Sequence, residues 1–208
     1  MKILIAIPCM DTVPAVFTQS LAMLQKVGEC AICMQLGSLV YDSRNALAKQ
    51  AIQMGADMVF WLDSDMVFEP DTLLKMYSSM KLDDLDFLTG VYYRRRDPYT
   101  PVIFDKADIQ EDGSCVTTEF EDIPERGLFE VGACGFGCVL MKTQMLVDTA
   151  LQFNDMFSPI GRTGEDISFC WRARQCGYKL MADPSIKLGH YSQQVVTRQF
   201  YEAFRRAK

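Results

Sequence analysis

Two carboxylates one residue apart follow a run of apolar residues in the first half of the chain. The run is Met-Val-Phe-Trp-Leu at residues 58–62, and Asp63 and Asp65 follow it with Ser64 between them. Such a run predicts a strand buried on both faces, so the acids stand at its carboxyl-terminal end. Ligands bind at that edge of an open α/β sheet, and carboxylates suit Mg²⁺ or Mn²⁺. The alternative is an acidic surface turn.

A second acidic pair, Glu165 and Asp166, follows a loop that contains two glycines and opens a predicted helix. The helix macrodipole also favours acids in a first turn, so a catalytic role and a structural role both remain open. The single histidine, His190, follows a short predicted strand. An imidazole at a strand end can bind a metal or can simply be a polar surface group.

Arginines occur at two places where an anion could be held. Arg44 falls near the start of a predicted helix, where the macrodipole disfavours a cation. Contact with an anionic ligand and simple solvation both fit that position. Arg94, Arg95 and Arg96 follow a predicted strand beside two tyrosines, and they could either cover phosphates or form a solvated edge.

The elements that must position these residues alternate between strands and helices. This order predicts a parallel sheet with right-handed crossovers. We expect Thr12 to cap the first helix, and Asp42 or Ser43 to cap the second, which places Arg44 in its first turn. Strands are predicted at residues 2–8, 31–36, 58–62 and 86–93, and helices at residues 13–27, from about 43 to 54, and from about 70.

The second half begins with antiparallel structure. Residues 100–120 alternate around Asp112-Gly113, which is a strong hairpin signal. Small residues within 132–137 allow close approach of the backbone to a neighbouring strand or to a ligand. The remaining predicted elements are helices at residues 144–152 and 165–175, strands at residues 179–182 and 186–189, and an amphipathic basic helix at residues 193–208 that either docks on the core or makes weak contact with a membrane surface.

Composition and net charge restrict the classes of protein to which this chain can belong. The chain has 208 residues, 49% hydrophobic residues and a net charge of −6, which fits one globular core and argues against nonspecific nucleic-acid binding through the whole surface. No stretch approaches the roughly 20 apolar residues of a transmembrane helix, and Pro8 interrupts the first apolar run, so we expect cytoplasmic residence. The eight cysteines are expected to be reduced thiols. No glycine-rich dinucleotide or P-loop signature follows a strand.

In their order along the chain, these features resemble the GT-A nucleotide-sugar glycosyltransferases, particularly small single-domain members of the family-2-like group. The resemblance rests on a first strand ending at Pro8 near Asp11, on Trp61-Leu62-Asp63-Ser64-Asp65, on the glycine-rich segment 132–137, on Gly164-Glu165-Asp166, and on Gly189-His190. It implies an α/β GT-A fold with a mostly parallel central sheet flanked by helices and a small antiparallel part in the second half.

The resemblance also implies a division of labour within a single domain. Residues 1–93 would bind the nucleotide sugar, residues 94–190 would form the acceptor and catalytic half, and residues 191–208 would be the C-terminal amphipathic helix. The donor would be a nucleoside-diphosphate sugar, with a UDP-sugar favoured, and the cofactor Mn²⁺ or Mg²⁺. The implied metal ligands are Asp63, Asp65 and His190, the implied donor contacts are Pro8, Asp11, Arg44, Asn45, Asp63 and Ser64, and the implied catalytic residues are Asp166 as general base and Glu165 as its assistant.

Some features depart from the larger family. The Q-x-x-R-W pattern of processive synthases is missing, which favours transfer of a single sugar, and the acceptor stays open among a protein, a glycan and a modified nucleobase. A carboxylate base favours inversion at the anomeric carbon, while a retaining outcome stays open. Two other functions compete: a nucleotidyltransferase, which normally has a lysine-bearing glycine-rich loop where this chain has residues 8–12, and a nucleotide-sugar-binding module without catalysis.

Overall fold

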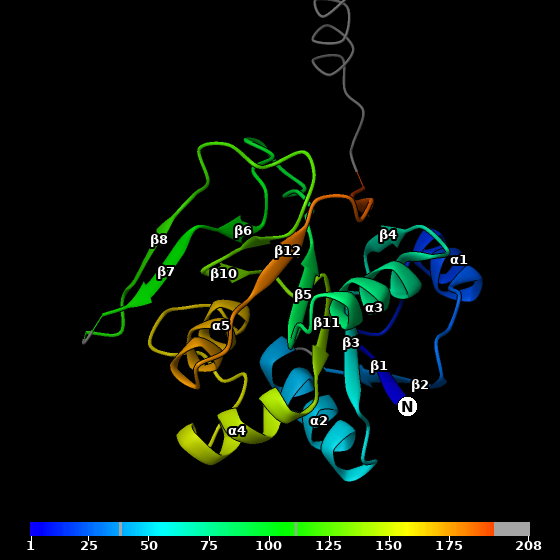
Figure 1. Ribbon diagram of the computed structural model, residues 1–208, viewed down its shortest axis with the longest axis horizontal. Coiled ribbons are helices and arrows are strands. Elements are labelled where there is room, and N and C mark those ends of the chain that lie inside the picture. The colour runs from blue at the N-terminus through cyan, green and yellow to red at the C-terminus, as the bar shows by residue number, and fades with distance from the viewer. Residues whose placement is uncertain (38, 111, 194–208) are drawn as a thin grey trace, which may run out of the picture.

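The chain forms a seven-stranded sheet in a computed structural model, which describes residues 1–37, 39–110 and 112–193. The strand order is β2-β1-β3-β11-β5-β12-β9, with β3, β11 and β5 in the middle (Figure 1). The strands are β1 (Lys2–Cys9), β2 (Glu29–Leu36), β3 (Met58–Leu62), β5 (Phe87–Gly90), β9 (Phe129–Glu130), β11 (Cys138–Lys142) and β12 (Met181–Asp183).

The sheet is mixed, and most of its strands run in one direction. β1 pairs in parallel with β2 and β3, and β12 pairs in parallel with β5. β11 lies antiparallel between β3 and β5, and β9 lies antiparallel to β12. Both reversed strands come from the second half of the chain, so the predicted fold class of a mostly parallel sheet with a small antiparallel part is confirmed.

Helices cover both faces of the sheet, because successive side chains of a strand point to opposite faces. Trp61 of β3 packs in the apolar core on one face with residues of three helices, and Phe60 packs in the core on the other face with residues of two. The first face carries α2 (Val40–Gln53), α4 (Gln144–Phe153) and α5 (Glu165–Gln175), and the second carries α1 (Ala15–Met23) and α3 (Thr72–Leu82) (Figure 1).

Three two-stranded pairs complete the described part of the chain. The Asp112-Gly113 hairpin forms as predicted between β7 (Lys106–Ile109) and β8 (Cys115–Thr118), and it projects from the body of the domain (Figure 1). β6 (Ile103–Phe104) pairs with β10 (Ala133–Cys134). β4 (Met66–Phe68) pairs with β13 (Leu188–His190), which joins the end of the described chain to the segment after Asp65.

Two predicted helix starts are wrong. α1 begins at Ala15 with Pro14 as its N-cap, not after Thr12, because the residue before a proline is disfavoured in the helical conformation and Val13 is therefore a poor helix start. α2 begins at Val40 with Leu39 as its N-cap. Ser43 is therefore a buried residue inside the helix, and neither it nor Asp42 is the cap. The predicted C-terminal helix at residues 193–208 lies almost entirely outside the described residues.

The earlier start of α2 moves Arg44 from the first turn into the second. The macrodipole argument for an anionic ligand at Arg44 therefore does not apply, since the dipole acts mainly within the first turn. A different reason for this arginine is found in its contacts with the protein itself.

The glycines of segment 132–137 serve packing within the protein. A Cβ at Gly132 would lie 2.6 Å from the backbone oxygen of Asp105 and 2.8 Å from Cα of Lys106. A Cβ at Gly135 or Gly137 would meet the ring of Tyr92. Of the two uses that the sequence left open, close approach to neighbouring protein groups is the one observed.

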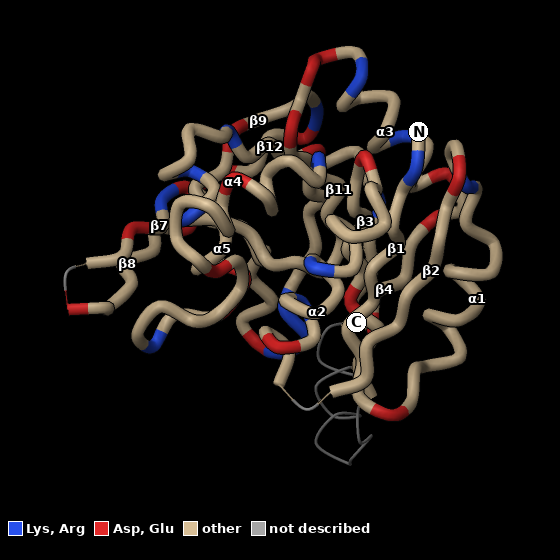
Figure 2. Tube along the Cα trace, turned by 90° about the horizontal axis from the view of Figure 1, so that it is seen from below, with Lys and Arg blue, Asp and Glu red and all other residues tan. Residues whose placement is uncertain are grey.

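The charged residues are distributed widely over the chain. Acidic and basic segments are interspersed along the tube in Figure 2, consistent with a moderate net charge of −6.

All eight cysteines are free thiols. Within the described ranges, every helix is too short or too polar to cross a lipid bilayer.

We expect Gly132→Ala to destabilise the protein by about 1–3 kcal/mol, because the added methyl group would press on backbone atoms that cannot rotate away. Chemical denaturation monitored by tryptophan fluorescence measures this change. Gly189→Ala is the matched control, since the nearest atom to its added Cβ, in Val67, would be 3.4 Å away in ordinary contact. Equal stability of the two variants would contradict the packing role.

Candidate functional site

The candidate site lies where several chain segments meet at one edge of the sheet. β1 and β3 end there, and the register of β11 with β3 places Cys138 opposite Leu62 and brings Gly137 to Asp63. The Asp63 backbone N–H donates to the Gly137 carbonyl oxygen at 3.1 Å. A pocket of about 360 Å³ at this edge is lined by Pro8, Cys9, Met10, Gly37, Val40, Ser43, Arg44, Asp63, Ser64, Asp65, Arg95, Glu165 and His190.

The pocket gathers most of the residues that the sequence singled out. Those that line it are Pro8, Arg44, Asp63, Ser64, Asp65, Glu165 and His190. A larger cavity of about 690 Å³ is lined by residues such as Tyr77, Lys81 and Lys142, and it contains none of them. The smaller pocket is therefore the better candidate, because the titratable groups converge on it.

His190 reaches Asp65 through the pairing of β13 with β4. His190 lies opposite Met66 in this register, and the Tyr191 backbone N–H donates to the Asp65 carbonyl oxygen at 2.8 Å. As a result, His190 Nε2 lies 3.5 Å from Asp65 Oδ2. Two side chains separated by 125 positions in the sequence thus face each other at the mouth of the pocket.

The other ring nitrogen of His190 fixes the orientation of the imidazole. Nδ1 lies 2.9 Å from the carbonyl oxygen of Tyr93, which can only accept a hydrogen bond, so Nδ1 carries a proton. Nε2 is then left to face Asp65 either protonated or with its lone pair toward a cation. Metal-binding histidines usually donate their second N–H to a carbonyl or carboxylate in this way.

The two side chains affect each other's ionisation. Burial lowers the pKa of His190, but the contacts with Asp65 and with the Tyr93 carbonyl raise it, and the net change is upward. Burial raises the pKa of Asp65, but His190 and Arg95 outweigh this effect and lower it. Asp65 is therefore an anion at neutral pH, beside one imidazole and one guanidinium.

The Asp65 and His190 pair fits a divalent cation that also binds a ligand from solution. Two adjacent ligands of an octahedral ion with bonds of about 2.1 Å are about 3 Å apart, close to the observed separation. Within residues 1–37, 39–110 and 112–193, no three His, Cys, Asp or Glu side chains are arranged to hold a metal. Mg²⁺ commonly uses one or two protein groups and completes its shell with phosphate oxygens and water.

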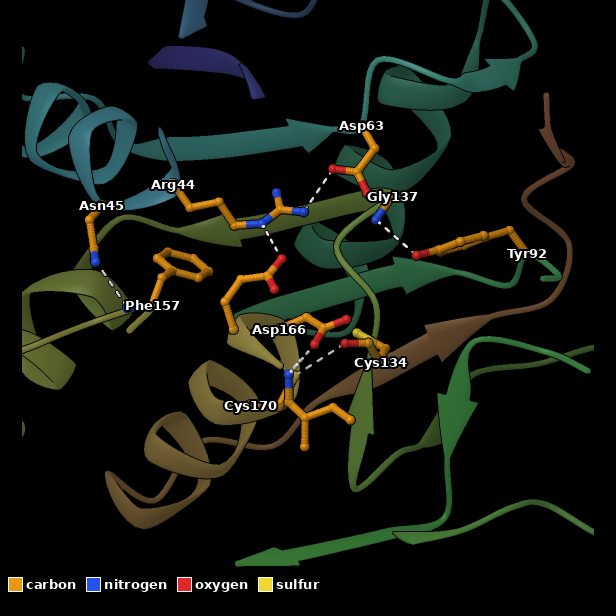
Figure 3. Close-up of polar contacts among 11 residues, drawn as sticks. Arg44, Asn45, Asp63, Tyr92, Cys134, Gly137, Phe157, Asp166 and Cys170 are labelled. Carbon is orange, nitrogen blue, oxygen red and sulfur yellow. Dashed lines mark hydrogen bonds and ion pairs between the residues drawn. The ribbon is translucent and has the colours of Figure 1, made fainter. Parts of the chain in front are cut away.

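Arg44 connects the first acidic pair to the second. Its side chain is 2% exposed, and Nη2 donates to Asp63 Oδ1 at 2.7 Å while Nε donates to Glu165 Oε1 at 3.2 Å. Figure 3 shows the guanidinium directed at Asp63, with Asp166 nearby on α5. One arginine therefore fixes the end of β3 relative to the start of α5.

Arg44 also lies close to two aromatic rings. Its guanidinium carbon lies 5.7 Å from the centroid of the Trp61 ring and 5.3 Å from that of Phe136. Burial lowers the pKa of the guanidinium, but the charges of Asp63 and Glu165 raise it by more, so the group stays charged. Its Nη1 has no hydrogen-bond partner within the described part of the chain.

Asp166 lies in the first turn of α5, next to this ion-pair network but outside the lining of the pocket. The Ile167 backbone N–H donates to its Oδ1 at 2.7 Å. Burial and the neighbouring charge of Glu165 raise the pKa of Asp166 from 3.8 to about 6. A carboxylate with this pKa is mostly ionised at neutral pH and is basic enough to accept a proton.

Two predicted donor contacts lie away from the pocket. Asp11 is exposed after the end of β1. Asn45 instead fastens the loop before α5: its Oδ1 accepts from the Phe157 backbone N–H at 3.0 Å, and its Nδ2 donates to Ser158 Oγ at 3.3 Å. Asn45 thus contributes to the position of the loop.

Several residues that line the pocket have no site role that could be predicted from the sequence. These are Cys9, Met10, Gly37, Val40, Ser43 and Arg95. Arg95 carried a sequence signal, since three consecutive arginines after a strand could cover phosphates, but that signal did not indicate which of them approaches the carboxylates. The others are small or apolar residues at the ends of β1 and β2 and at the start of α2, with nothing chemical to mark them.

No protein-family model matches the chain, and no curated protein matches its sequence. Among solved structures it is similar to A197 from STIV, with a TM-score of 0.65, 21% identity, and coverage of 93% of this chain and 87% of that one.

A second similar structure is GalNAc-T7 with UDP, GalNAc and Mn²⁺, with a TM-score of 0.61, 10% identity, and coverage of 99% of this chain and 47% of that one. The chain therefore spans about half the length of GalNAc-T7. At these identities the likeness shows the fold, and the chain has the GT-A fold that its sequence predicts.

We expect Arg44→Met to destabilise the protein by about 3–5 kcal/mol, because it leaves Asp63 and Glu165 partly buried without a counter-charge. Lys75→Met is the matched control. Lys75 also contacts two carboxylates, Glu69 and Asp71, but on the surface, so its loss should cost much less stability than the loss of Arg44. Denaturant unfolding measures both, and equal losses would contradict the central role of Arg44.

Asp166→Asn should stabilise the protein above pH 6, because the raised pKa means that the ionised carboxylate costs the fold roughly 2–3 kcal/mol there. The folded state binds the proton more tightly than the unfolded state, so the stability contributed by Asp166 falls as pH rises from 3.8 to 6. Urea unfolding of both proteins as a function of pH measures the difference. A gain that does not shrink toward pH 3.8 would contradict the assigned pKa.

Proposed function

We propose that this chain is a metal-dependent glycosyltransferase, a small single-domain member of the family-2-like group. It would transfer one sugar from a nucleoside-diphosphate sugar to an acceptor hydroxyl. The observation that carries the proposal is the meeting of Asp65 with His190 at a pocket whose wall is tied through Arg44 to Glu165, beside Asp166. This reaction needs a pair of side chains that can bind a divalent metal and, at the same edge of the sheet, a carboxylate that can accept a proton.

The metal would be held by Asp65 and His190. Asp63 is better placed to support Arg44 or to contact the ribose, because one of its oxygens is already bound to the guanidinium. When bound, Mn²⁺ or Mg²⁺ supplies positive charge that stabilises the departing diphosphate. The structure of GalNAc-T7 contains Mn²⁺, which supports the choice of a divalent ion in this fold.

The nucleoside would occupy the part of the pocket formed by the end of β1 and the start of α2. Pro8, Val40 and Ser43 line this part. We favour a UDP-sugar as the donor, since the GalNAc-T7 structure contains UDP. Residues 1–93 would then form the nucleotide-sugar half, and residues 94–190 the acceptor and catalytic half.

Asp166 would act as the general base. As the acceptor oxygen attacks the anomeric carbon, the carboxylate would take the hydroxyl proton, while the nucleoside diphosphate leaves on the opposite face. Direct displacement in this manner inverts the anomeric centre. Glu165 would assist by holding Arg44 in place, because its carboxylate is bound to the Arg44 guanidinium.

Two alternatives use the same fold. A nucleotidyltransferase would need cationic groups for a triphosphate after β1, where this chain has Cys9 and Met10. A binding module without catalysis would use the same pocket for the donor but would not need the raised pKa of Asp166. Measuring turnover, and its dependence on Asp166, therefore distinguishes the glycosyltransferase from these alternatives.

The first experiment is a thermal-unfolding screen against UDP, GDP, dTDP and CMP, each with Mn²⁺ or with EDTA. A ligand at about 100 times its dissociation constant stabilises the fold by about 2.7 kcal/mol, which gives a clear upward shift in Tm. We expect one nucleotide to stabilise the parent only with Mn²⁺, and not to stabilise Asp65→Ala. Asp122→Ala, which removes an exposed carboxylate outside the pocket, should behave as the parent.

The nucleotide identified in this way allows turnover to be measured as release of nucleoside diphosphate from the matching sugar donor. Asp166→Asn should keep the nucleotide-induced shift in Tm and lose turnover. A parent that binds the nucleotide without turning over any donor would favour the binding module. Absence of any shift with all four nucleotides would contradict the donor site itself.

A further inference from the structure

A second cavity adjoins the pocket of about 360 Å³ described above, which is called the donor pocket from here on. It has a volume of about 400 Å³ and is lined by Tyr92, Arg94, Arg95, Arg96, Asp97, Val102 and His190. Arg95 and His190 line both this cavity and the donor pocket, so they form the wall between them. The donor site as described above uses His190 but gives no role to the three arginines.

The arginines lie on a loop that is closed by backbone hydrogen bonds. The Val102 N–H donates to the Tyr92 carbonyl oxygen at 2.9 Å, and the Arg94 N–H donates to that of Thr100 at 2.9 Å. At the tip, the Tyr99 N–H donates to the Arg96 carbonyl oxygen at 2.7 Å. These bonds hold the backbone of the three arginines in a fixed arrangement next to the carboxylates of the site.

The charge of this loop is opposite to that of the chain as a whole. Three guanidinium groups and one carboxylate, Asp97, line the cavity, in a protein with a net charge of −6. Guanidinium groups present forked donors that match the oxygens of phosphate. A cavity with this lining is suited to a phosphate or diphosphate group.

Arg95 occupies the position on Asp65 that a metal would need. Its Nη1 lies 2.7 Å from Asp65 Oδ2, the same oxygen that faces His190 Nε2 at 3.5 Å. The side chain of Arg95 is 47% exposed, so it has room to move. A divalent cation bound between Asp65 and His190 would repel the guanidinium and take over its contact with Oδ2.

We propose that this basic cavity, lined by residues 94–97 with Tyr92, Val102 and His190, is a phosphate subsite, and that Arg95 exchanges between two anions. Without metal, Arg95 pairs with Asp65; when a divalent cation takes Asp65, Arg95 turns to the phosphate in the cavity. The exchange half of this inference rests on the proposed metal site. The phosphate belongs either to the donor diphosphate or to a phosphorylated acceptor, and both present the same chemistry to the arginines.

Calorimetric titration of the parent, Arg95→Gln and Arg126→Gln tests the exchange. Arg126 is exposed and lines neither cavity, so its variant controls for the loss of one positive charge. With Mn²⁺ alone, Arg95→Gln should bind the ion about two- to fivefold more tightly than the parent, because a half-exposed competing ion pair is gone. With inorganic pyrophosphate and saturating Mn²⁺, it should bind on the order of tenfold more weakly, because a charged hydrogen-bond donor is missing.

Exchange of Arg95 between the two anions predicts that Arg95→Gln binds Mn²⁺ more tightly and pyrophosphate more weakly than the parent does. A variant that binds both Mn²⁺ and pyrophosphate as the parent does would overturn the proposal, and so would one that binds both more weakly. If the parent binds no Mn²⁺, the proposed metal site fails. The subsite is then judged on pyrophosphate binding in EDTA, where Arg95 stays on Asp65, so binding must weaken in Arg96→Gln, which removes another arginine of the cavity, and not in Arg126→Gln.

A second titration distinguishes the source of the phosphate. Inorganic phosphate is added to the parent and to Arg95→Gln in the presence of saturating UDP and Mn²⁺. Phosphate that still binds the parent and loses affinity in the variant assigns the subsite to the acceptor. Phosphate excluded by UDP, together with weaker UDP binding by Arg95→Gln, assigns it to the donor diphosphate. Phosphate and UDP binding that are both insensitive to Arg95 would overturn the subsite.

Discussion

The buried charge of Arg44 is the constraint on which the arrangement of the site depends. A guanidinium that is almost fully removed from water must be paired, and its partners come from the end of β3 and the start of α5. The ion pairs therefore fix Asp63 relative to Glu165 across 102 positions of sequence. Asp65 follows Asp63 by two residues and Asp166 follows Glu165 by one, so the same contacts position the proposed metal ligand and the proposed base.

The sheet topology supplies the remaining parts of the site. β11 is inserted antiparallel between β3 and β5, and this brings Gly137 to Asp63 and Tyr92 to the glycine segment. The pairing of β13 with β4 brings His190 from the far end of the described chain to Asp65. Asp65 and Glu165 thus each meet a partner that is remote in sequence. The apolar cores on the two faces of the sheet hold the strands and helices that carry these residues.

Much of this architecture could be predicted from local sequence patterns. The buried strand before Asp63, the Asp112-Gly113 hairpin and the helix that starts at Glu165 each follow from periodicity or turn chemistry within a few residues. The insertion of β11 between β3 and β5 could not be predicted in this way, because strand neighbours in a mixed sheet need not be neighbours in sequence. The predicted helix starts were wrong where proline or burial outweighed a favourable cap residue, as at Pro14 and Ser43.

The contacts of the candidate site were the least predictable part. The sequence left open whether Arg44 contacts an anionic ligand or solvent, and its contacts with two carboxylates of the protein itself could be found only from the tertiary structure. Arg95 could not be distinguished from Arg94 and Arg96 by sequence, since only its placement relative to Asp65 sets it apart. The resemblance implies a nucleoside contact for Asn45, and the sequence carried no signal of the hydrogen bonds by which its side chain fastens the loop at Phe157 and Ser158.

The most direct test of the proposed metal site is the location of Mn²⁺ by anomalous scattering in crystals grown with the nucleotide that stabilises the protein. We expect one peak within bonding distance of Asp65 Oδ2 and His190 Nε2, with Arg95 moved off Asp65. A peak bound elsewhere in the protein, or no peak while Arg95 still pairs with Asp65, would contradict the proposed metal site and with it the mechanism derived from this pocket.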